Sequence, residues 1–166
     1  MTMNNEFVIR DKYKLLVEKL IYLKKTISTM ESCTGGLIAS LITDHEGASK
    51  CIKEAFVTYS NEAKIKQGVS EEYIKDFGVY SYEVAFKMCS MCKENAGSDI
   101  SIGITGTFAN ADPNNNDSVP GLVFYTIYYD GDYYQHQLNV PTDKDRYNSK
   151  LFVADKIVDT LLAIIV

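Results

Sequence analysis

A strand-to-helix turn near the N-terminus constrains the fold of this chain more than any other feature. The apolar segment 26–30 is typical of a buried strand, and segment 37–42 is typical of a helix. Between them, residues 31–36 read Glu-Ser-Cys-Thr-Gly-Gly. A serine in such a turn, here Ser32, points its hydroxyl outward beside free backbone N–H groups, where an anion can be held. The turn therefore predicts an α/β fold with a candidate site at the end of the first strand.

Helices and strands alternate along most of the chain and end in a hairpin and a helix. Helices are predicted over residues 11–25, 37–44 and 82–95, after Ser60 and Ser70, and after a final cap at Thr142. Strands are predicted at 26–30, 56–59, 99–105, 122–129 and 133–140, the last two joined by the turn Asp130-Gly131. Such alternation covers both faces of a sheet with helices. We expect one domain, residues 11–166, folded as a three-layer α/β/α sandwich with a mixed sheet.

Two polar segments interrupt this pattern. Residues 1–10 are expected to be a flexible N-terminus, because they are polar and terminal. Residues 108–118 are rich in Asn, Asp and Ala, and they are expected to form a mobile surface loop.

Composition excludes several classes of function. A net charge of −5 over 166 residues lacks the basic footprint of nucleic-acid binding. No apolar run reaches transmembrane length and no signal peptide is evident, so we expect a cytoplasmic protein that does not bind membranes. Cys89 and Cys92 have CxxC spacing, but they lie in a predicted helix with no second pair and no nearby histidine. Their pattern favours core packing over a redox or metal site, and no metal or cofactor is expected.

Ser32 is the candidate nucleophile, and it needs a neighbouring base. The two histidines, His45 and His136, have no acidic neighbour placed to orient them, which argues against a Ser–His–Asp triad. Lys64 is the alternative base, provided that burial lowers its pKa. The Tyr59 hydroxyl, shortly before Lys64, is placed to relay a proton or to hold the lysine.

The residues after Ser32 admit two interpretations. In a catalytic site, the N–H groups of Cys33 and Thr34 stabilise an oxyanion, while Gly35 and Gly36 let a substrate approach closely. In a structural turn, the same residues form a helix cap and a tight packing contact. Cys33 is a rival nucleophile or a small core residue.

Two further candidates lie later in the chain. Thr105-Gly106 ends a predicted strand and forms either a second anion-binding corner or a simple turn. Arg146 either meets a phosphate or lies solvated on the surface. The tyrosine-rich hairpin favours cross-strand packing or a homodimer interface.

Several segments resemble the CinA C-terminal domain family of nicotinamide-nucleotide amidases, found in competence- and damage-inducible CinA proteins. They are residues 29–36, 47–49, 56–64 and 78–81 and Thr105-Gly106, and the resemblance runs from about Leu15 to the last helix. It implies a hydrolase without metal that converts nicotinamide mononucleotide to nicotinate mononucleotide and ammonia, in pyridine nucleotide salvage.

The resemblance also implies roles for individual residues. Ser32 is the nucleophile and Lys64 the general base, with Tyr59 and Ser49 in support. The substrate pocket is lined by Thr34, Gly35, Gly36, Thr105 and Gly106. Arg146 contributes to phosphate binding or to structure.

One loop departs from the family pattern. The family usually follows Thr-Gly with a hydrophobic residue and Ala-Gly-Pro, whereas residues 107–113 here read Thr-Phe-Ala-Asn-Ala-Asp-Pro. Two alternatives to the amidase follow from this loop. One is a weak or inactive ligand-binding or regulatory module, and the other is a Ser/Lys amidase with a different substrate.

Overall fold

A five-stranded mixed sheet forms the centre of the computed structural model, which describes residues 3–166. The strands are β1 (Ile27–Glu31), β2 (Ile52–Val57), β3 (Ile100–Gly106), β4 (Leu122–Tyr129) and β5 (Asp132–Asn139). They lie in the order β2-β1-β3-β4-β5. Strand β1 is parallel to β2 and β3, and β4 is antiparallel to β3 and β5. The predicted α/β sandwich with a mixed sheet is confirmed.

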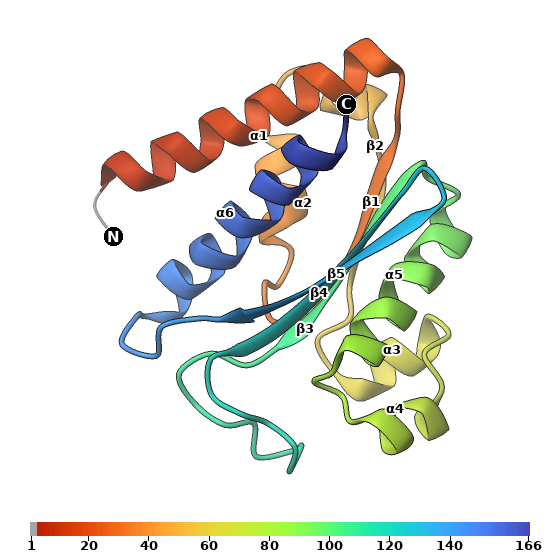
Figure 1. Cartoon of the computed structure of the whole chain (residues 1–166), viewed down its shortest axis with the longest axis vertical. Helices are drawn as coiled ribbons and strands as arrows, with labels where there is room; N and C mark the ends of the chain where they lie inside the picture. The colour runs from red at the N-terminus through yellow and green to blue at the C-terminus, as the bar shows by residue number, and fades with distance from the viewer. Residues whose placement is uncertain (1–2) are drawn as a thin grey trace.

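Helices cover both faces of this sheet (Figure 1). On one face lie α1 (Met3–Leu23), α2 (Leu37–Thr43) and α6 (Arg146–Ile164). On the other lie α3 (Asn61–Lys66), α4 (Glu71–Phe77) and α5 (Tyr82–Ala96). A short 3₁₀ turn, η1 (Ala48–Lys50), precedes β2. None of the helices within residues 3–166 combines the length and apolarity needed to cross a membrane.

The period of two along β3 explains how the two layers pack. Ile100, Ile102 and Ile104 enter the larger apolar core under α1, α2 and α6. Gly103 points to the other face, where an added Cβ would meet the backbone of Ala85 and Cys89 in α5. The glycine therefore lets α5 lie directly against the sheet. On the hairpin, Tyr128 and Tyr133 are directly opposite and their rings pack together, as cross-strand pairing predicts.

Helix caps confirm some predicted boundaries and correct others. The hydroxyls of Ser60, Ser70 and Ser81 accept N–H bonds at the starts of α3, α4 and α5. The prediction that Thr142 caps the last helix is wrong. Asp145 caps it, because its carboxylate accepts the Asn148 N–H at 2.8 Å.

The N-terminal boundary is also corrected. Helix α1 begins at Met3, not at Asp11. Ile9 is fully buried and extends the apolar face that includes Tyr13, and Arg10 pairs with Asp44 at 2.7 Å. Residues 1 and 2 of the segment predicted to be flexible lie outside the described residues.

Candidate functional site

Alternation along β1 sends Glu31 and Ser32 to opposite faces of the sheet. The Glu31 carboxylate is fully buried on the α2 side, where it accepts the N–H groups of Ile38 and Ala39 at 2.9 and 3.0 Å and the Thr34 hydroxyl at 2.7 Å. The protein's own carboxylate therefore occupies the N-terminus of α2. This corrects the expectation that a ligand anion is held there, and it gives Glu31 a role that the sequence did not reveal.

Gly35 and Gly36 have a backbone role in the same turn. Their φ angles are +61° and +99°, a region that residues with a Cβ rarely adopt. An added Cβ at Gly35 would approach the Lys150 amine at 3.2 Å. Neither glycine is among the residues that line the pocket described below. The pair turns the chain from β1 into α2, outside the lining of that pocket.

Lys64 lies beside Ser32, as predicted. Its amine donates to the Ser32 hydroxyl at 3.1 Å and to the Thr58 carbonyl at 2.9 Å. The carbonyl is held in place because the Thr58 N–H continues the sheet to the Glu31 carbonyl at 2.8 Å. The short helix α3, capped by Ser60, then carries Lys64 back under the end of β1. Two segments distant in sequence thus place a hydroxyl and an amine in contact.

Burial gives Lys64 the character that a general base requires. Its side chain is only 1% exposed, and desolvation lowers its pKa from 10.5 to about 8. The charge of Asp112 acts in the opposite direction on the Lys64 pKa without reversing the shift. A useful fraction of Lys64 is therefore neutral near pH 7 to 8, in the form that can accept a proton.

Cys33 is a poor rival to Ser32. Burial raises the pKa of its thiol to about 12, so the thiolate is scarce at neutral pH. The side chain packs in the larger apolar core and also reaches the pocket. Of the two sequence interpretations, the structure supports a small core residue.

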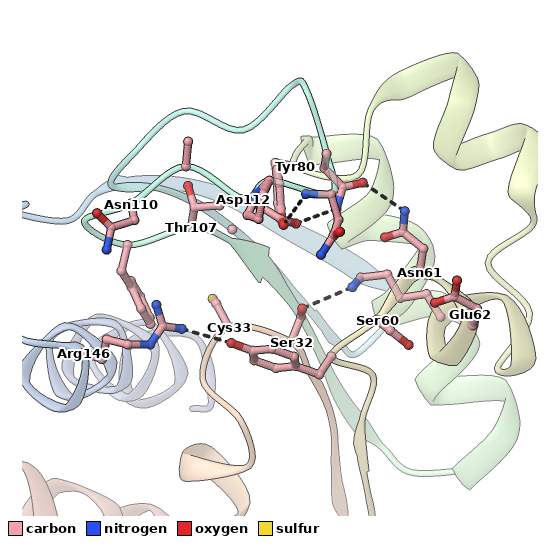
Figure 2. Close-up of a pocket in the computed structure, with 18 residues that line it drawn as sticks. Ser32, Cys33, Ser60, Asn61, Glu62, Tyr80, Thr107, Asn110, Asp112 and Arg146 are labelled. Carbon is pink, nitrogen blue, oxygen red and sulfur yellow. Dashed lines mark hydrogen bonds between the residues drawn. The ribbon is translucent and has the colours of Figure 1, made fainter.

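Tyr59 contacts Arg146, not Lys64. The Tyr59 hydroxyl accepts a hydrogen bond from the Arg146 guanidinium at 3.0 Å, and the guanidinium also lies 5.5 Å from the centre of the Phe108 ring. Lys64 contacts the Thr58 carbonyl, whereas the sequence predicted that it would contact the Tyr59 hydroxyl. Figure 2 shows Arg146 on one side of Ser32 and Cys33, with Asp112 and Tyr80 on another.

A pocket of about 650 Å³ opens above Ser32 and Lys64. This volume is in the range of small-molecule sites. Its wall includes three groups of residues: Tyr59 to Glu62, the loop from Gly106 to Asn115, and Arg146. The pocket thus joins the end of β1, the start of α3, the 107–118 loop and the start of α6.

The 107–118 loop is held by specific contacts. Phe108 is 1% exposed and packs in the larger core, so the prediction that this residue belongs to a surface loop is wrong. The Asp112 carboxylate accepts hydrogen bonds from the Tyr80 hydroxyl and the Asn115 amide. Asn115 in turn accepts from Asn61 at 2.9 Å. Asp112 and Asn115 therefore tie the loop to α3 and to the segment before α5.

The remaining predicted residues divide between the pocket and other places. Gly106 lines the pocket, whereas the Thr34 and Thr105 hydroxyls donate to Glu31 and to the Val79 carbonyl. Ser49 is exposed in η1, next to the start of β2, which pairs with the start of β1. Because Ser32 follows the far end of β1, the structure does not bring Ser49 into the site.

Metal ligands do not gather in this region. Across residues 3–166, no group of three or more His, Cys, Asp or Glu side chains is placed to hold a metal ion.

Comparison with known proteins identifies the family. A family model described as the CinA C-terminal domain matches residues 10–161. The chain belongs to the CinA C-terminal domain family. A CinA-like protein of Kosmotoga olearia is 38% identical over 143 residues, which cover 84% of this chain and 34% of that protein. A putative competence-damage inducible protein of Clostridium perfringens is 39% identical over 138 residues, 82% of this chain and 32% of that protein. The chain thus spans about a third of the length of these relatives.

Solved structures of the CinA superfamily share the fold. A competence/damage inducible protein from Agrobacterium tumefaciens aligns with a TM-score of 0.85 and 27% identity, covering 93% of this chain and 94% of that one. A CinA superfamily protein from Escherichia coli aligns with a TM-score of 0.84 and 26% identity, covering 98% and 92%. The pocket described above is therefore a feature of a CinA-family domain.

Proposed function

We propose that this CinA-family domain is an amidase that hydrolyses the carboxamide of nicotinamide mononucleotide, giving nicotinate mononucleotide and ammonia. The observation that carries the proposal is the contact between the Ser32 hydroxyl and a Lys64 amine whose pKa is lowered by burial. The amine stands at the floor of a pocket large enough for a mononucleotide. The choice of substrate rests on the resemblance of this chain to the family of nicotinamide-nucleotide amidases.

The chemistry follows from the two side chains. Neutral Lys64 accepts the proton of the Ser32 hydroxyl as the oxygen attacks the carboxamide carbon. The resulting oxyanion needs N–H donors. We assign this role to the N–H groups of Cys33 and Thr34, which make no backbone–backbone hydrogen bond within residues 3–166. The protonated Lys64 then gives its proton to the departing nitrogen, and ammonia leaves an acyl-serine ester.

Water completes the cycle. Lys64, neutral again, accepts a proton from a water molecule that attacks the ester carbon. The carboxylic acid is released as Ser32 recovers its proton from Lys64. The Thr58 carbonyl keeps the amine oriented throughout, because it accepts one of the amine's hydrogens in both protonation states.

Arg146 is the group that we assign to the substrate phosphate. It lies at the pocket wall, and its only side-chain hydrogen bond among the described residues goes to the Tyr59 hydroxyl. A phosphate is a charged acceptor that matches the guanidinium fork, so it competes well with a phenol for the same donors. Tyr59 then lies beside the bound phosphate and helps to close the site.

Ammonia release from nicotinamide mononucleotide tests this function. We expect release by the purified chain, and a loss of several orders of magnitude in both Ser32→Ala and Lys64→Met, because the two residues act as a unit. Ser40→Ala, an exposed serine in α2, and Lys66→Met, an exposed lysine in α3, are the matched controls. Both controls should retain the wild-type rate.

The outcomes separate the alternatives. Binding of the nucleotide without ammonia release, by folded wild-type protein, would instead indicate a ligand-binding module. Release that survives Ser32→Ala would refute the mechanism. Release from other amides but not from this nucleotide would indicate a Ser/Lys amidase with a different substrate.

A further inference from the structure

The pocket contains an acidic side chain that the proposed reaction does not use. We propose that Asp112 is a specificity residue, which selects amides on a ring with a fixed positive charge over neutral rings of the same shape. The inference rests on the proposed function and adds to it the feature of the substrate that the enzyme recognises.

The carboxylate of Asp112 is held in place and stays ionised. One oxygen, Oδ2, accepts from the Tyr80 hydroxyl and the Asn115 amide. The other, Oδ1, accepts the Asn114 N–H at 2.9 Å. Burial acts to raise the pKa of Asp112, but these hydrogen bonds outweigh it and the pKa is lowered overall. A carboxylate oxygen can accept two hydrogen bonds or meet a cation, so Oδ1 retains capacity for a ligand.

The charges around the pocket leave Asp112 without a permanent partner. No ion pair of Asp112 is found within the described part of the chain. Lys64 acts on it through charge, but Lys64 has to be neutral when it accepts the serine proton. Arg146 is engaged with Tyr59 and Phe108 on a different side of Ser32 (Figure 2). Before the attack, while Lys64 is neutral, a cation on the substrate is the group that balances Asp112.

Nicotinamide attached to ribose through its ring nitrogen carries such a cation. The carboxamide is a substituent on the same small ring that contains the positive nitrogen. A carboxamide placed at Ser32 therefore puts the charge inside the pocket that Asp112 lines. The ring charge does not change when the carboxamide is attacked. Its attraction to Asp112 is therefore equal in the ground and transition states, and it acts on binding and KM rather than on kcat.

Binding measurements on an inactive background test the inference directly. Ser32→Ala, with and without Asp112→Asn, is titrated by calorimetry with nicotinamide mononucleotide. The second ligand is its benzamide analogue, in which carbon replaces the ring nitrogen and the charge is absent. Asp117→Asn is the matched control. It lies in the same loop and accepts the Tyr80 N–H at 3.4 Å, but it does not line the pocket.

We expect Asp112→Asn to weaken binding of the charged nucleotide about fivefold, in keeping with a partly exposed charge pair. Binding of the neutral analogue should change less than about twofold. Asp117→Asn should leave the ratio of the two affinities unchanged. In the active chain, assayed above pH 8 where most of Lys64 is neutral, Asp112→Asn should raise KM for the nucleotide more than it changes kcat. The pH matters because removing the Asp112 charge also lowers the Lys64 pKa.

An unchanged ratio of affinities in Asp112→Asn, or an equal loss for both ligands, would overturn the role of Asp112 while leaving the amidase intact. A wild-type chain that releases no ammonia from the nucleotide would overturn the amidase itself. The two failures are therefore told apart by the ammonia assay and the binding ratio.

Discussion

Replacing Lys64 with methionine should remove activity and yet stabilise the fold near neutral pH. The Lys64 pKa falls from 10.5 to about 8 because burial penalises the charged amine. Each unit of pKa shift corresponds to about 1.4 kcal/mol, so the ionised lysine costs the folded state about 3 kcal/mol at pH 7. Methionine has a similar volume and no charge. It leaves the Thr58 carbonyl without its partner, a loss of about 1 to 2 kcal/mol that does not depend on pH.

The pH dependence isolates the effect of the charge. The pKa of Lys64 is lower in the folded than in the unfolded chain, so between about pH 8 and 10.5 the unfolded chain binds more protons. The contribution of Lys64 to the free energy of unfolding therefore rises with pH through this window. We expect the stability advantage of Lys64→Met over wild type to shrink by about 2.5 kcal/mol from pH 7 to pH 10.

Urea denaturation of both proteins at several pH values measures this difference, since titrations common to both cancel. Lys66→Met is the matched control, because Lys66 is exposed in the same helix. Its stability difference from wild type should stay constant over the range. A constant difference for Lys64→Met as well would refute the argument that burial lowers the pKa of this amine.

Three further predictions follow from the site. The kcat/KM for amide hydrolysis should rise about tenfold per pH unit up to the Lys64 pKa of about 8 and then level off, since the reaction needs the neutral amine; a flat profile would contradict this. Glu31→Gln should lower the free energy of unfolding by about 1 to 3 kcal/mol, because an amide nitrogen cannot accept the N–H groups of α2, whereas the exposed Glu62→Gln should not. The rate of Cys33 alkylation at pH 8, measured by mass spectrometry of the peptide that contains it, should be at least about a hundredfold lower in the folded than in the unfolded chain. Equal rates would contradict the raised pKa of this thiol.

Local patterns predicted most of the fold. Alternation and turn signals placed β4 at its observed bounds, and serine caps placed the starts of α3, α4 and α5. One error arose where two residues compete for the same role. Both Thr142 and Asp145 are good caps, and only the path of the chain from β5 decides that Asp145 accepts from Asn148.

The site was only partly predictable. The residues alone offered Lys64 as a base for Ser32, and the family resemblance favoured this pair over a structural interpretation of the turn. The role of Glu31 depends on which face of β1 meets α2, a property of the packed structure. Likewise, the sequence predicted a contact between Tyr59 and Lys64. In the structure the Tyr59 hydroxyl accepts a hydrogen bond from Arg146, because α6 begins beside the pocket. Contacts between distant elements carry no local signal.

The support of Lys64 by the main chain has a consequence for how this site tolerates change. The group that orients the amine is the Thr58 carbonyl, which every amino acid possesses, and sheet pairing with Glu31 fixes its position. The Thr58 side chain is 2% exposed, and its hydroxyl finds no partner among the described residues. Residues of similar size, such as valine, can therefore replace Thr58 without disturbing the contact between Lys64 and Ser32. Substitution of the Thr58 side chain therefore leaves the main-chain acceptor of the Lys64 amine in place.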